Sequence, residues 1–487
     1  MCGIVGISAR RDVVQSLLSG LQALEYRGYD SAGIAVIADA AVQRLRAKGK
    51  VADLVARQEA TPVAGQCGIA HTRWATHGVP NEGNAHPHVS GAVSVVHNGI
   101  IENHSSLRTE LRALGYHFES QTDTEVIAHL IEHLRAGGLS LLAAVQAAVK
   151  RLHGAYSIAV VSASEPDRVV GARLGSPLVV GLGEDEQYLA SDIHALLPMT
   201  RRFIYLAEGD VVAIEPTGVR VFDAEDRPVE RPVRESRFDL AAAQKGGYRH
   251  FMLKEIHEQP QVLADTLEGR IAGGRILTNI LGVDAADLLD RTEAVHIIAC
   301  GTSFHAGLVA RYWIESVAGV PCTTEIASEY RYRDPVVRPG TLFVSVSQSG
   351  ETADTLAALK LARQRGYLAE LAVCNVPESS IVRESALVLM TRAGPEIGVA
   401  STKAFTTQLV ALALFALELG RAKGMPEARY LDGVRQLERL PALVAEALRL
   451  DEQLKALAER FANKQHALFL GRGSHWPVAM EGALKLK

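Results

Sequence analysis

Met1-Cys-Gly-Ile-Val-Gly6 opens the chain and places a cysteine directly after the initiator methionine, ahead of a short apolar run. Cysteine is small enough to allow removal of Met1, which leaves Cys2 as the first residue. Its α-amino group, whose ordinary pKa is about 7.7–8.0, then accepts the thiol proton. The thiolate is the effective nucleophile. The stretch therefore predicts an N-terminal nucleophile, Cys2, that attacks an amide carbonyl.

An Asn-Gly pair, Asn98-Gly99, follows the apolar run Val93-Ser-Val-Val96. Two interpretations of this pair stay open. Asn-Gly is the commonest two-residue hairpin turn. Alternatively, the Asn98 side-chain amide and the Gly99 backbone N–H form an oxyanion hole, in which each donor lowers the barrier by about 3–4 kcal/mol.

Two charged residues are suited to bind the ends of an amino acid. Arg73, within the stretch from Ala70 to Gly78, can clamp a carboxylate with two parallel hydrogen bonds. Asp123 lies in Thr122-Asp-Thr-Glu125, where a helix is expected to begin. Its structural interpretation is an N-cap, and its functional interpretation is a partner for an α-ammonium group.

Histidines and cysteines do not form a metal-ligand pattern. The histidines that crowd the same region are His71, His77, His86, His88, His97 and His104. The five cysteines are Cys2, Cys67, Cys300, Cys322 and Cys374. The spacing of neither set fits a standard metal site, so we expect no metal and no other cofactor. An odd number of cysteines at such spacing favours the reducing cytosol, and thus a cytoplasmic protein.

Length and composition are those of a globular protein. The 487 residues suggest roughly three domains, and 48% hydrophobic with 22% charged residues is an ordinary balance. The net charge of -4 argues against a nucleic-acid partner. The longest apolar helical stretch, Leu409 to Leu417, is too short to span a membrane. Arg10, Arg11 and Asp12 interrupt any signal-peptide pattern.

The first half, up to about residue 240, is predicted to be rich in strands. Short apolar segments separated by turn residues begin at Gly33, Val93, Ala155, Leu178 and Asp210. Helical spacing of apolar residues predicts helices near 124–135 and 141–152. Residues 223–247 are dense in charge, contain two prolines and end in a Gly-Gly pair. This composition favours a linker over a further exposed hairpin with a charged turn.

The pattern changes after residue 247. Val295-His-Ile-Ile-Ala, Leu342-Phe-Val-Ser-Val and Leu368 to Val373 are nearly continuous apolar runs, and a helix follows each of the first two. This alternation is typical of a parallel α/β sheet.

Hydroxyl-rich turns follow two of these strands. Ser347-Gln-Ser-Gly-Glu-Thr352 comes after one strand and Gly301-Thr-Ser303 after its neighbour. One interpretation is that serine and threonine only cap the helices. Two such turns at the carboxyl edge of one sheet favour a phosphate site, since ligands bind at that edge and helix N-termini attract anions. The missing Gly-Lys-Ser/Thr ending excludes a nucleotide P-loop.

A strand–turn–helix pattern occurs twice in the second half. The first copy begins at Val295 and leads into a helix from about 304, and the second begins at His466 and leads into a helix from about 477. The second copy stops after one strand and one helix, which cannot bury their apolar faces alone. We therefore expect that the chain ends inside its last domain.

Several long motifs resemble a known family. They are Met1-Cys-Gly-Ile-Val-Gly6, Leu24-Glu-Tyr-Arg-Gly-Tyr-Asp-Ser-Ala-Gly33, His71-Thr-Arg-Trp-Ala-Thr-His77, His97-Asn-Gly-Ile-Ile-Glu-Asn103, Cys300-Gly-Thr-Ser303, Ser347-Gln-Ser-Gly-Glu-Thr352 and Glu396-Ile-Gly-Val-Ala-Ser-Thr-Lys-Ala-Phe405. Together they are similar to the glutamine–fructose-6-phosphate aminotransferases (isomerizing), the glucosamine-6-phosphate synthases, over the whole chain.

The resemblance implies a fold and an activity. The expected fold is an αββα glutaminase sandwich of the N-terminal-nucleophile type, followed by doubly wound α/β sugar isomerase domains, the last incomplete. The expected limits are 2–222 for the glutaminase, 223–247 for the linker, 248–430 for the first isomerase domain and 431–487 for the start of the second. The family releases ammonia from glutamine and transfers it to fructose 6-phosphate, and it implies a homodimer that needs no nucleic acid or membrane.

The resemblance also assigns site residues. The catalytic residues are Cys2, Asn98, Gly99 and Lys485; glutamine is held by Arg73, Thr76, His77 and Asp123; Trp74 resembles the gate of an ammonia channel; and fructose 6-phosphate is bound by Thr302, Ser303, Ser347, Gln348, Ser349, Thr352, Val399 and Ser401. The family's isomerase glutamate, ring-opening histidine and Schiff-base lysine have no counterpart before Lys487. We therefore expect glutaminase activity without complete isomerase chemistry.

Two other functions compete with this one. A purine-pathway amidotransferase should carry an acidic pair beside a phosphoribosyl-diphosphate loop, and an asparagine synthetase a Ser-Gly-Gly-type ATP loop. Neither pattern occurs after residue 250. A regulator that only senses sugar phosphates would need the two hydroxyl-rich turns but not Cys2, Arg73, Asn98 and Asp123.

Overall fold

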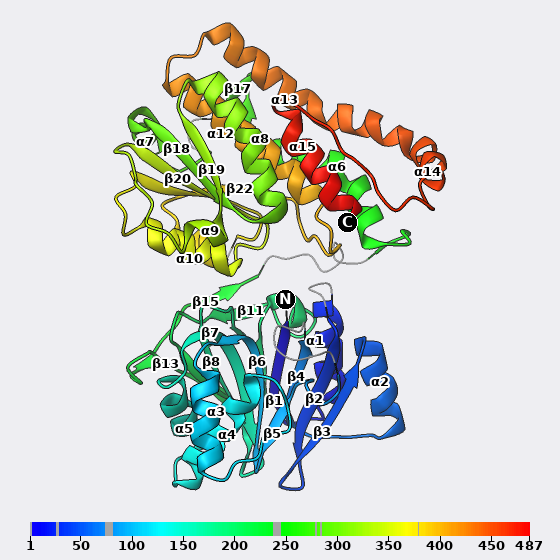
Figure 1. Ribbon diagram of the computed structural model, residues 1–487, viewed down its shortest axis with the longest axis vertical. Helices are drawn as coiled ribbons and strands as arrows, with labels where there is room; N and C mark the ends of the chain where they lie inside the picture. Colours follow the sequence, from blue (N-terminus) through cyan, green and yellow to red (C-terminus); the bar gives the residue numbers. More distant parts are fainter. Residues whose placement is uncertain are drawn as a thin grey trace. The chain divides into compact units, whose positions relative to one another are not determined.

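The chain folds into two compact units, which the computed structural model divides at Leu240 and Ala241 (Figure 1). The described residues are 2–25, 29–73, 81–236, 245–277, 280–282, 285–377 and 379–487. Each unit has its own hydrophobic clusters, so each is described by itself.

Two antiparallel sheets form the centre of the first unit (Figure 1). The eight-stranded sheet has the order β15-β11-β9-β10-β1-β4-β2-β3. Its strands are β1 (Gly3–Ala9), β2 (Ser31–Ala38), β3 (Ala41–Lys48), β4 (Cys67–Arg73), β9 (Val179–Leu182), β10 (Glu186–Ala190), β11 (Arg202–Tyr205) and β15 (Val233–Glu235). The seven-stranded sheet has the order β14-β13-β12-β8-β7-β6-β5. Its strands are β5 (His88–Ser90), β6 (Val93–Ile101), β7 (Gly154–Ser162), β8 (Glu165–Leu174), β12 (Val211–Glu215), β13 (Gly218–Phe222) and β14 (Pro228–Val229).

Helices cover the outer face of each sheet. Those on the eight-stranded sheet are α1 (Val14–Leu24) and α2 (Val51–Ala60), and those on the seven-stranded sheet are α3 (His104–Ala113), α4 (Thr124–Ala136) and α5 (Leu141–Val149). One apolar cluster, which includes Ile4, Val96 and Val212, fills the space between the two sheets. A second cluster lies between the eight-stranded sheet and its helices, and a third lies between the seven-stranded sheet and its helices. The result is the four-layer αββα sandwich, as predicted.

Burial on both faces explains the apolar start of the chain. A central strand of such a sandwich has the second sheet on one side and helices on the other, so its residues need not alternate with polar ones. All residues of β1 are buried. The predicted strands beginning near Gly33, Val93, Ala155, Leu178 and Asp210 are confirmed. The two predicted helices correspond to α4 and α5.

Part of the segment 223–247 belongs to the sheets. β13 and β14 form an exposed hairpin, and its turn is closed by Arg227, whose Nε donates to Asp223 Oδ2 at 2.8 Å. β15 then pairs with β11. The alternative of a hairpin with a charged turn thus describes residues 218–229. Residues 237–244 lie outside the described part, and the domain limits given above stay a prediction.

A five-stranded parallel sheet forms the centre of the second unit, in the order β19-β18-β20-β21-β22. Its strands are β18 (Ala294–Ala299), β19 (Cys322–Ile326), β20 (Thr341–Ser347), β21 (Ala369–Cys374) and β22 (Leu387–Met390), beside a separate two-stranded ribbon of β16 (Ile271–Ala272) and β17 (Arg275–Ile276). Apolar clusters cover both faces of the parallel sheet, which makes this unit doubly wound, as predicted.

The helices of the second unit surround this sheet. They are α6 (Phe251–Leu267), α7 (Ala285–Arg291), α8 (Gly301–Ala318), α9 (Ala327–Tyr330), α10 (Ala353–Ala362), α11 (Ser380–Glu384), α12 (Lys403–Ala422), α13 (Glu427–Ala447), α14 (Asp451–Glu459) and α15 (His475–Leu486). By length and composition α12 alone among the described helices resembles a membrane span, but it is 78% buried in the core and packs between α6 and α8. It is therefore a core helix.

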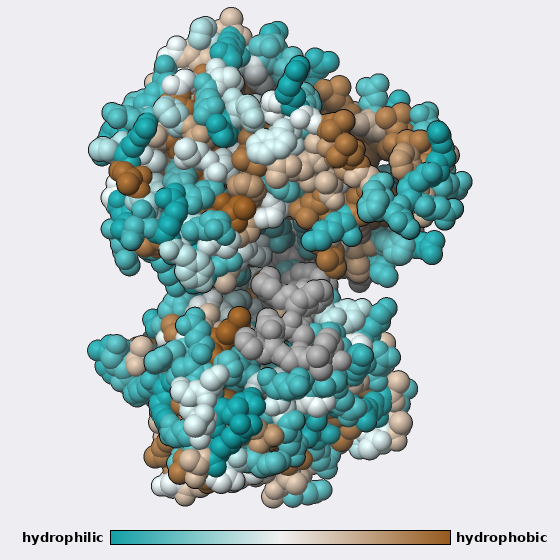
Figure 2. All heavy atoms as spheres, viewed as in Figure 1, coloured by the Kyte–Doolittle hydropathy of each residue, from teal (hydrophilic) through white to brown (hydrophobic). Residues whose placement is uncertain are grey.

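The second copy of the strand–turn–helix pattern differs from the prediction. Its helix, α15, is present, but residues 466–470 form no strand. Leu468 and Leu470 are each 83% exposed, because no strand of the described residues pairs with this segment and no sheet covers it. A strand needs both contacts. Figure 2 shows apolar side chains on the surface around α13, α14 and α15.

Candidate active sites

The candidate nucleophile lies at the start of a central strand. Cys2 directly precedes β1 and is partly exposed. The next residue must be small, because a Cβ on Gly3 would lie 2.7 Å from Thr72 Oγ1 and 2.9 Å from Leu24 Cβ. Gly3 thus lets β1 pack closely against β4 and α1 at the point where Cys2 is held.

The Asn-Gly pair is part of a strand, so the hairpin interpretation is wrong. β6 continues through Asn98 and Gly99, which pair with Ser157 and Tyr156 of β7. The Asn98 Nδ2 donates to the backbone oxygen of Cys2 at 3.3 Å. This hydrogen bond joins the two sheets, because Cys2 precedes a strand of one sheet and Asn98 lies in the other.

Gly99 has a conformation that other residues rarely adopt. Its φ is 126°, and an added Cβ would lie 2.0 Å from the carbonyl oxygen of Ala155. Both facts require glycine at this position. Gly99 directly follows Asn98 in β6, so the two predicted oxyanion donors are consecutive residues of one strand.

A buried histidine fixes the orientation of the Asn98 amide. His71 Nε2, on β4, lies 3.0 Å from Asn98 Oδ1 and 3.0 Å from the backbone oxygen of His97. Because both neighbours are acceptors, Nε2 carries the hydrogen. Burial lowers the pKa of His71 to about 3, so the ring is neutral near pH 7. With Oδ1 held by His71, the Asn98 NH2 group must face Cys2.

The two charged residues predicted to bind an amino acid are both buried near this point. Arg73 ends β4, and the pairing of Gly3 with Thr72 places it beside Cys2. Its Nη1 lies 3.7 Å from Asp30 Oδ1. Asp123 occupies the N-cap position of α4 but makes no capping hydrogen bond; its Oδ2 instead accepts from the Ile101 N–H at 2.9 Å. Asp123 is therefore tied to the strand that carries Asn98.

Other residues predicted for this site have different outcomes. Trp74, Thr76 and His77 lie outside the described residues. His71, His86, His88 and His97 gather in the buried interior. Across the part of the chain that the structure describes, no three histidine, cysteine or acidic side chains converge as metal ligands.

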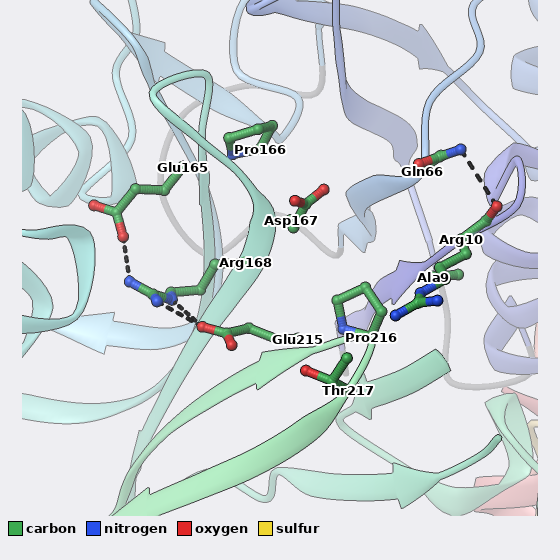
Figure 3. Close-up of a pocket in the computed structure, with 10 residues that line it drawn as sticks. All are labelled: Ala9, Arg10, Gln66, Glu165, Pro166, Asp167, Arg168, Glu215, Pro216 and Thr217. Atoms are coloured by element: carbon green, nitrogen blue, oxygen red, sulfur yellow. Dashed lines mark hydrogen bonds and ion pairs between the residues drawn. The ribbon is translucent and has the colours of Figure 1, made fainter. Parts of the chain in front are cut away.

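A cavity in the first unit does not coincide with this site. It has a volume of about 490 Å³ and is lined by Ala9, Arg10, Asp167 and Thr217, among others (Figure 3). Ala9 is the last residue of β1, so the cavity opens about 20 Å along the strand from Cys2. The candidate active site around Cys2 is therefore identified by its residues and their contacts, and not by the volume of a cavity.

The second candidate site lies at a switch in strand order. The chain passes from β18 to β19 on one side and then to β20 on the other side of β18. In open α/β sheets, ligands bind outside the carboxyl ends of strands at such a point. The turns that follow β18 and β20 are those containing Thr302–Ser303 and Ser347–Thr352, so the predicted phosphate turns are neighbours.

The hydroxyls of these turns do not cap their helices. Neither Cys300, the N-cap of α8, nor Thr352, the N-cap of α10, makes a side-chain capping bond. Ser347 Oγ instead accepts from the Gly350 N–H at 2.9 Å, which closes the turn on itself. An added Cβ on Gly350 would lie 2.0 Å from Ser379 Oγ. The capping interpretation is therefore wrong for both turns.

Lys485 reaches the first of these turns. Its Nζ donates to Thr302 Oγ1 at 3.0 Å and pairs with Glu481 Oε1 at 2.8 Å. Glu481 also accepts from Thr302 at 2.9 Å, and its Oε2 lies 2.7 Å from His305 Nδ1. Burial alone would raise the pKa of Glu481, but the bonds from His305 and Lys485 outweigh it and lower the pKa. Sequence analysis missed Glu481 and His305, because their roles depend on contacts between distant helices.

The predicted residues of the loop after β22 are less enclosed. Val399 is 86% exposed, and Ser401 Oγ donates to Glu396 Oε2 at 2.8 Å. The buried Glu255 on α6, also missed, accepts from the N–H groups of Ile397 and Gly398 at 2.5 and 2.9 Å. Because β22 is parallel to β20, the loop begins at the same carboxyl edge.

Comparison with known proteins gives matches in both units. The glutamine amidotransferase domain family matches residues 71–198, and the SIS domain family matches residues 288–418. The glutamine–fructose-6-phosphate aminotransferase (isomerizing) of Pseudomonas putida is 59% identical over 490 residues, which cover 100% of this chain and 80% of that protein. The Pseudomonas aeruginosa protein of the same name is 56% identical over 494 residues with the same coverage. A solved structure, the C-terminal domain of glucosamine-fructose-6-phosphate aminotransferase from Francisella tularensis, shares 51% identity, covers 50% of this chain and 69% of that one, and has a TM-score of 0.49.

The fold and the two matched domains define a glutamine amidotransferase joined to a sugar isomerase (SIS) domain. Relatives that are more than half identical cover the whole chain. The chain therefore belongs to the glutamine–fructose-6-phosphate aminotransferase (isomerizing) family, and it spans 80% of the length of these relatives.

Proposed function

We propose that this protein is an amidotransferase that hydrolyses glutamine at Cys2 and directs the ammonia to fructose 6-phosphate, the route to glutamate and glucosamine 6-phosphate, and that residues 1–487 by themselves carry out the glutaminase step. The observation that carries the proposal is the hydrogen bond from Asn98 Nδ2 to the Cys2 oxygen, which brings the predicted oxyanion donor next to the predicted nucleophile. Family membership supplies the two substrates.

The first step is attack of the Cys2 thiolate on the side-chain amide carbon of glutamine. The α-amino group, free once Met1 is removed, takes the thiol proton and returns it to the leaving ammonia. The C–N bond breaks and a γ-glutamyl thioester forms. Water then attacks the thioester, which releases glutamate and restores the thiol.

The oxyanion of each tetrahedral intermediate is held by Asn98 and Gly99. An Asn NH2 group has two hydrogens, so Nδ2 can keep the Cys2 oxygen and still donate to the oxyanion. The Gly99 N–H is the second donor. Removal of one such donor typically costs about 3–4 kcal/mol of barrier.

Charged residues would hold the ends of glutamine. Arg73 would bind the α-carboxylate and Asp123 the α-ammonium, and both are already positioned beside Cys2 and β6. Thr76 and His77 would complete this pocket and Trp74 would gate the passage of ammonia, as the family resemblance implies.

The second unit would bind fructose 6-phosphate. The turns after β18 and β20 would hold the phosphate with Thr302, Ser303, Ser347, Gln348, Ser349 and Thr352, with Val399 and Ser401 alongside. Lys485 would act at the sugar, since its ammonium already lies against Thr302. We further propose a cytoplasmic homodimer, with the domain limits predicted above.

An isotope experiment tests the proposal. Glutamine labelled with ¹⁵N at its amide and fructose 6-phosphate are incubated with the wild-type protein, Cys2→Ala and Cys67→Ala. Cys67 is a matched control because it is buried in the same unit, away from Asn98. We expect glutamate from the wild type and Cys67→Ala only. Glutamate from Cys2→Ala would contradict the role of Cys2, and robust formation of ¹⁵N-glucosamine 6-phosphate would contradict the expectation of incomplete isomerase chemistry stated above.

A further inference from the structure

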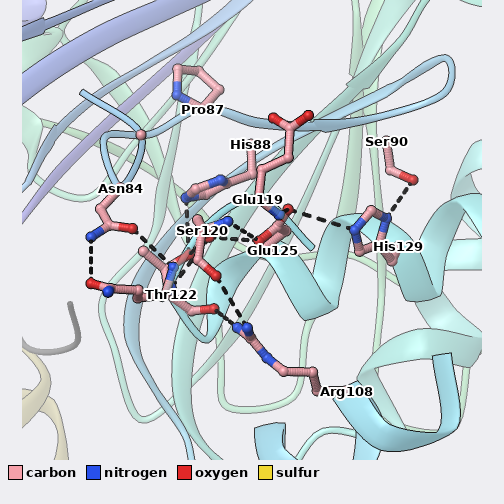
Figure 4. Close-up of polar contacts among 12 residues, drawn as sticks. Asn84, Pro87, His88, Ser90, Arg108, Glu119, Ser120, Thr122, Glu125 and His129 are labelled. Atoms are coloured by element: carbon pink, nitrogen blue, oxygen red, sulfur yellow. Dashed lines mark hydrogen bonds and ion pairs between the residues drawn. The ribbon is translucent and has the colours of Figure 1, made fainter. Parts of the chain in front are cut away.

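The residues just before Asp123 are held by side chains instead of by a neighbouring strand. Residues 119–122 form a loop that leads into α4, and their backbone N–H and C=O groups point at polar side chains from three other segments (Figure 4). We refer to these four residues as the 119–122 loop. Its position fixes where Asp123 begins the helix.

The centre of this arrangement is Glu125, one residue after the start of α4. Its Oε1 accepts from the Glu119 N–H at 2.8 Å, and its Oε2 accepts from the N–H and the hydroxyl of Ser120, both at 2.7 Å. The side chain thus reaches back over the loop, and the residue is only 4% exposed.

Glu125 is ionised in this position. Burial alone would raise the pKa of Glu125, but the His129 ring, whose Nε2 lies 3.7 Å from Oε1, and the hydrogen bonds from the N–H groups of Glu119 and Ser120 outweigh it, so the pKa lies well below its usual range. An ionised carboxylate is an acceptor at both oxygens, which suits three donors.

Arg108 of α3 holds the same loop from its carbonyl side. Its Nη1 donates to the Ser120 oxygen at 3.1 Å and its Nη2 donates to the Thr122 oxygen. The loop is therefore held between an anion that binds its N–H groups and a cation that binds its C=O groups. Both partners are charged, which makes these hydrogen bonds stronger than neutral ones.

Asn84, in the segment before β5, and His88, the first residue of β5, complete the attachment. Asn84 Oδ1 accepts from the Gln121 N–H at 2.9 Å, and its Nδ2 donates to Gln121 Oε1 at 3.2 Å. His88 Nε2 lies 3.0 Å from Thr122 Oγ1. Each residue of the 119–122 loop thus has at least one hydrogen bond to a side chain from outside it.

This loop delivers Asp123 to the proposed glutamine site. Asp123 Oδ2 is held by the Ile101 N–H of β6, three residues after Asn98. A salt bridge to an α-ammonium depends steeply on geometry, so a loop shift of about 1 Å would weaken it strongly. Asp123 directly follows the loop in the chain, so a shift of the loop would also move the Asp123 backbone.

We infer that Glu125 is a positioning residue that sets the preference for an α-amino substrate by holding the 119–122 loop and, through it, Asp123. The inference rests on the proposed function, because it concerns the same glutamine site. Glu125 touches no substrate in this account and acts only through the loop.

The test compares glutamine with 4-carbamoylbutanoate, which is glutamine without its α-ammonium group. The variant Glu125→Gln places an amide NH2 among N–H donors, so the loop loses acceptors. The matched control is Glu132→Gln, a half-buried carboxylate further along the same helix. We expect Glu125→Gln to lower the ratio of kcat/KM for glutamine over kcat/KM for 4-carbamoylbutanoate by roughly tenfold or more, mainly through KM for glutamine. Glu132→Gln should leave the ratio unchanged.

A second variant covers the case in which Glu125→Gln does not fold. Arg108→Lys keeps the charge but loses the two-pronged contact, at a side chain that is only partly buried. It should lower the same ratio. An equal loss on both substrates, in either variant, would overturn the inference and leave Glu125 with a merely structural role. Failure of the wild type to hydrolyse glutamine would instead overturn the proposed function.

Discussion

At the scale of single residues, the proposed chemistry depends on the direction of one side-chain amide. Asn98 has a donor end and an acceptor end, and only the contact from His71 Nε2 to Oδ1 tells them apart. The motif His97-Asn-Gly predicted the oxyanion donors, but nothing in the sequence indicated that His71, 27 residues earlier, orients them. Contacts across two sheets depend on the folded register, which local patterns do not encode.

The role of His71 can be tested by comparing a replacement side chain that cannot donate a hydrogen bond with one that can. In His71→Phe the Asn98 amide loses its anchor, so we expect kcat for glutamine hydrolysis to fall by about 10–100-fold with little change in KM. His71→Gln places an amide donor at similar reach and should recover much of the loss. Steady-state glutamate release measures both. An unchanged kcat in His71→Phe, or an effect confined to KM, would contradict this role.

Gly99 is expected to be irreplaceable for two separable reasons. Gly99→Ala suffers both the positive φ and the contact with Ala155 O, so we expect a loss of about 3 kcal/mol or more in unfolding free energy. Gly115 also has a positive φ, but an added Cβ meets no atom of the described residues within 4 Å. Gly115→Ala should cost only about 1–2 kcal/mol. Denaturant unfolding compares the two, and equal costs would show that the contact does not matter.

At the scale of helices and strands, sequence patterns predicted the features that depend on residues close together in the chain. The runs at Val295 and Leu342 are parallel strands, and the turns after them are neighbours, because parallel strands end at one edge. The strand predicted at 466–470 is wrong, because an apolar run becomes a strand only beside a partner. Local patterns did not predict Glu125, Glu255 and Glu481 either. Each of these side chains binds a segment that is distant in sequence or lies across a turn.

The buried histidines of β4 and β5 and the segment between these strands predict an acid-sensitive first unit. Burial lowers the pKa of His71 and His88 to about 3 each, and that of His86 also lies well below its usual range. The unfolded chain binds protons at about pH 6.5, whereas these folded rings do not. The folded form therefore loses stability as pH falls below about 6.5, by up to about 1.4 kcal/mol per pH unit for each ring.

Two measurements check this expectation. The unfolding free energy of the first unit should fall by up to about 4 kcal/mol between pH 6 and pH 5, if all three rings contribute. The ring proton resonances of these histidines should not titrate above pH 5 in the folded protein. Assigned resonances that titrate near pH 6.5 would show that the rings are solvated and would remove the basis of the prediction.

At the scale of the whole molecule, each unit has its own clusters of buried apolar residues. We therefore expect a fragment of residues 2–236 to fold alone and to release glutamate from glutamine. Glutamate release and a cooperative thermal transition measure the two properties. A soluble, folded fragment without activity, beside an active whole chain, would show that the second unit is needed for hydrolysis.

The central claim is that Cys2 attacks glutamine, and trapping the intermediate tests it most directly. Wild-type protein is mixed with glutamine, quenched with acid within milliseconds to seconds, and the N-terminal peptide is analysed by mass spectrometry. We predict that the peptide starts at Cys2 and carries one γ-glutamyl group on its sulfur, which hydroxylamine removes. Active protein in which Cys2 never carries this group, or carries it while Met1 is still attached, would contradict the account.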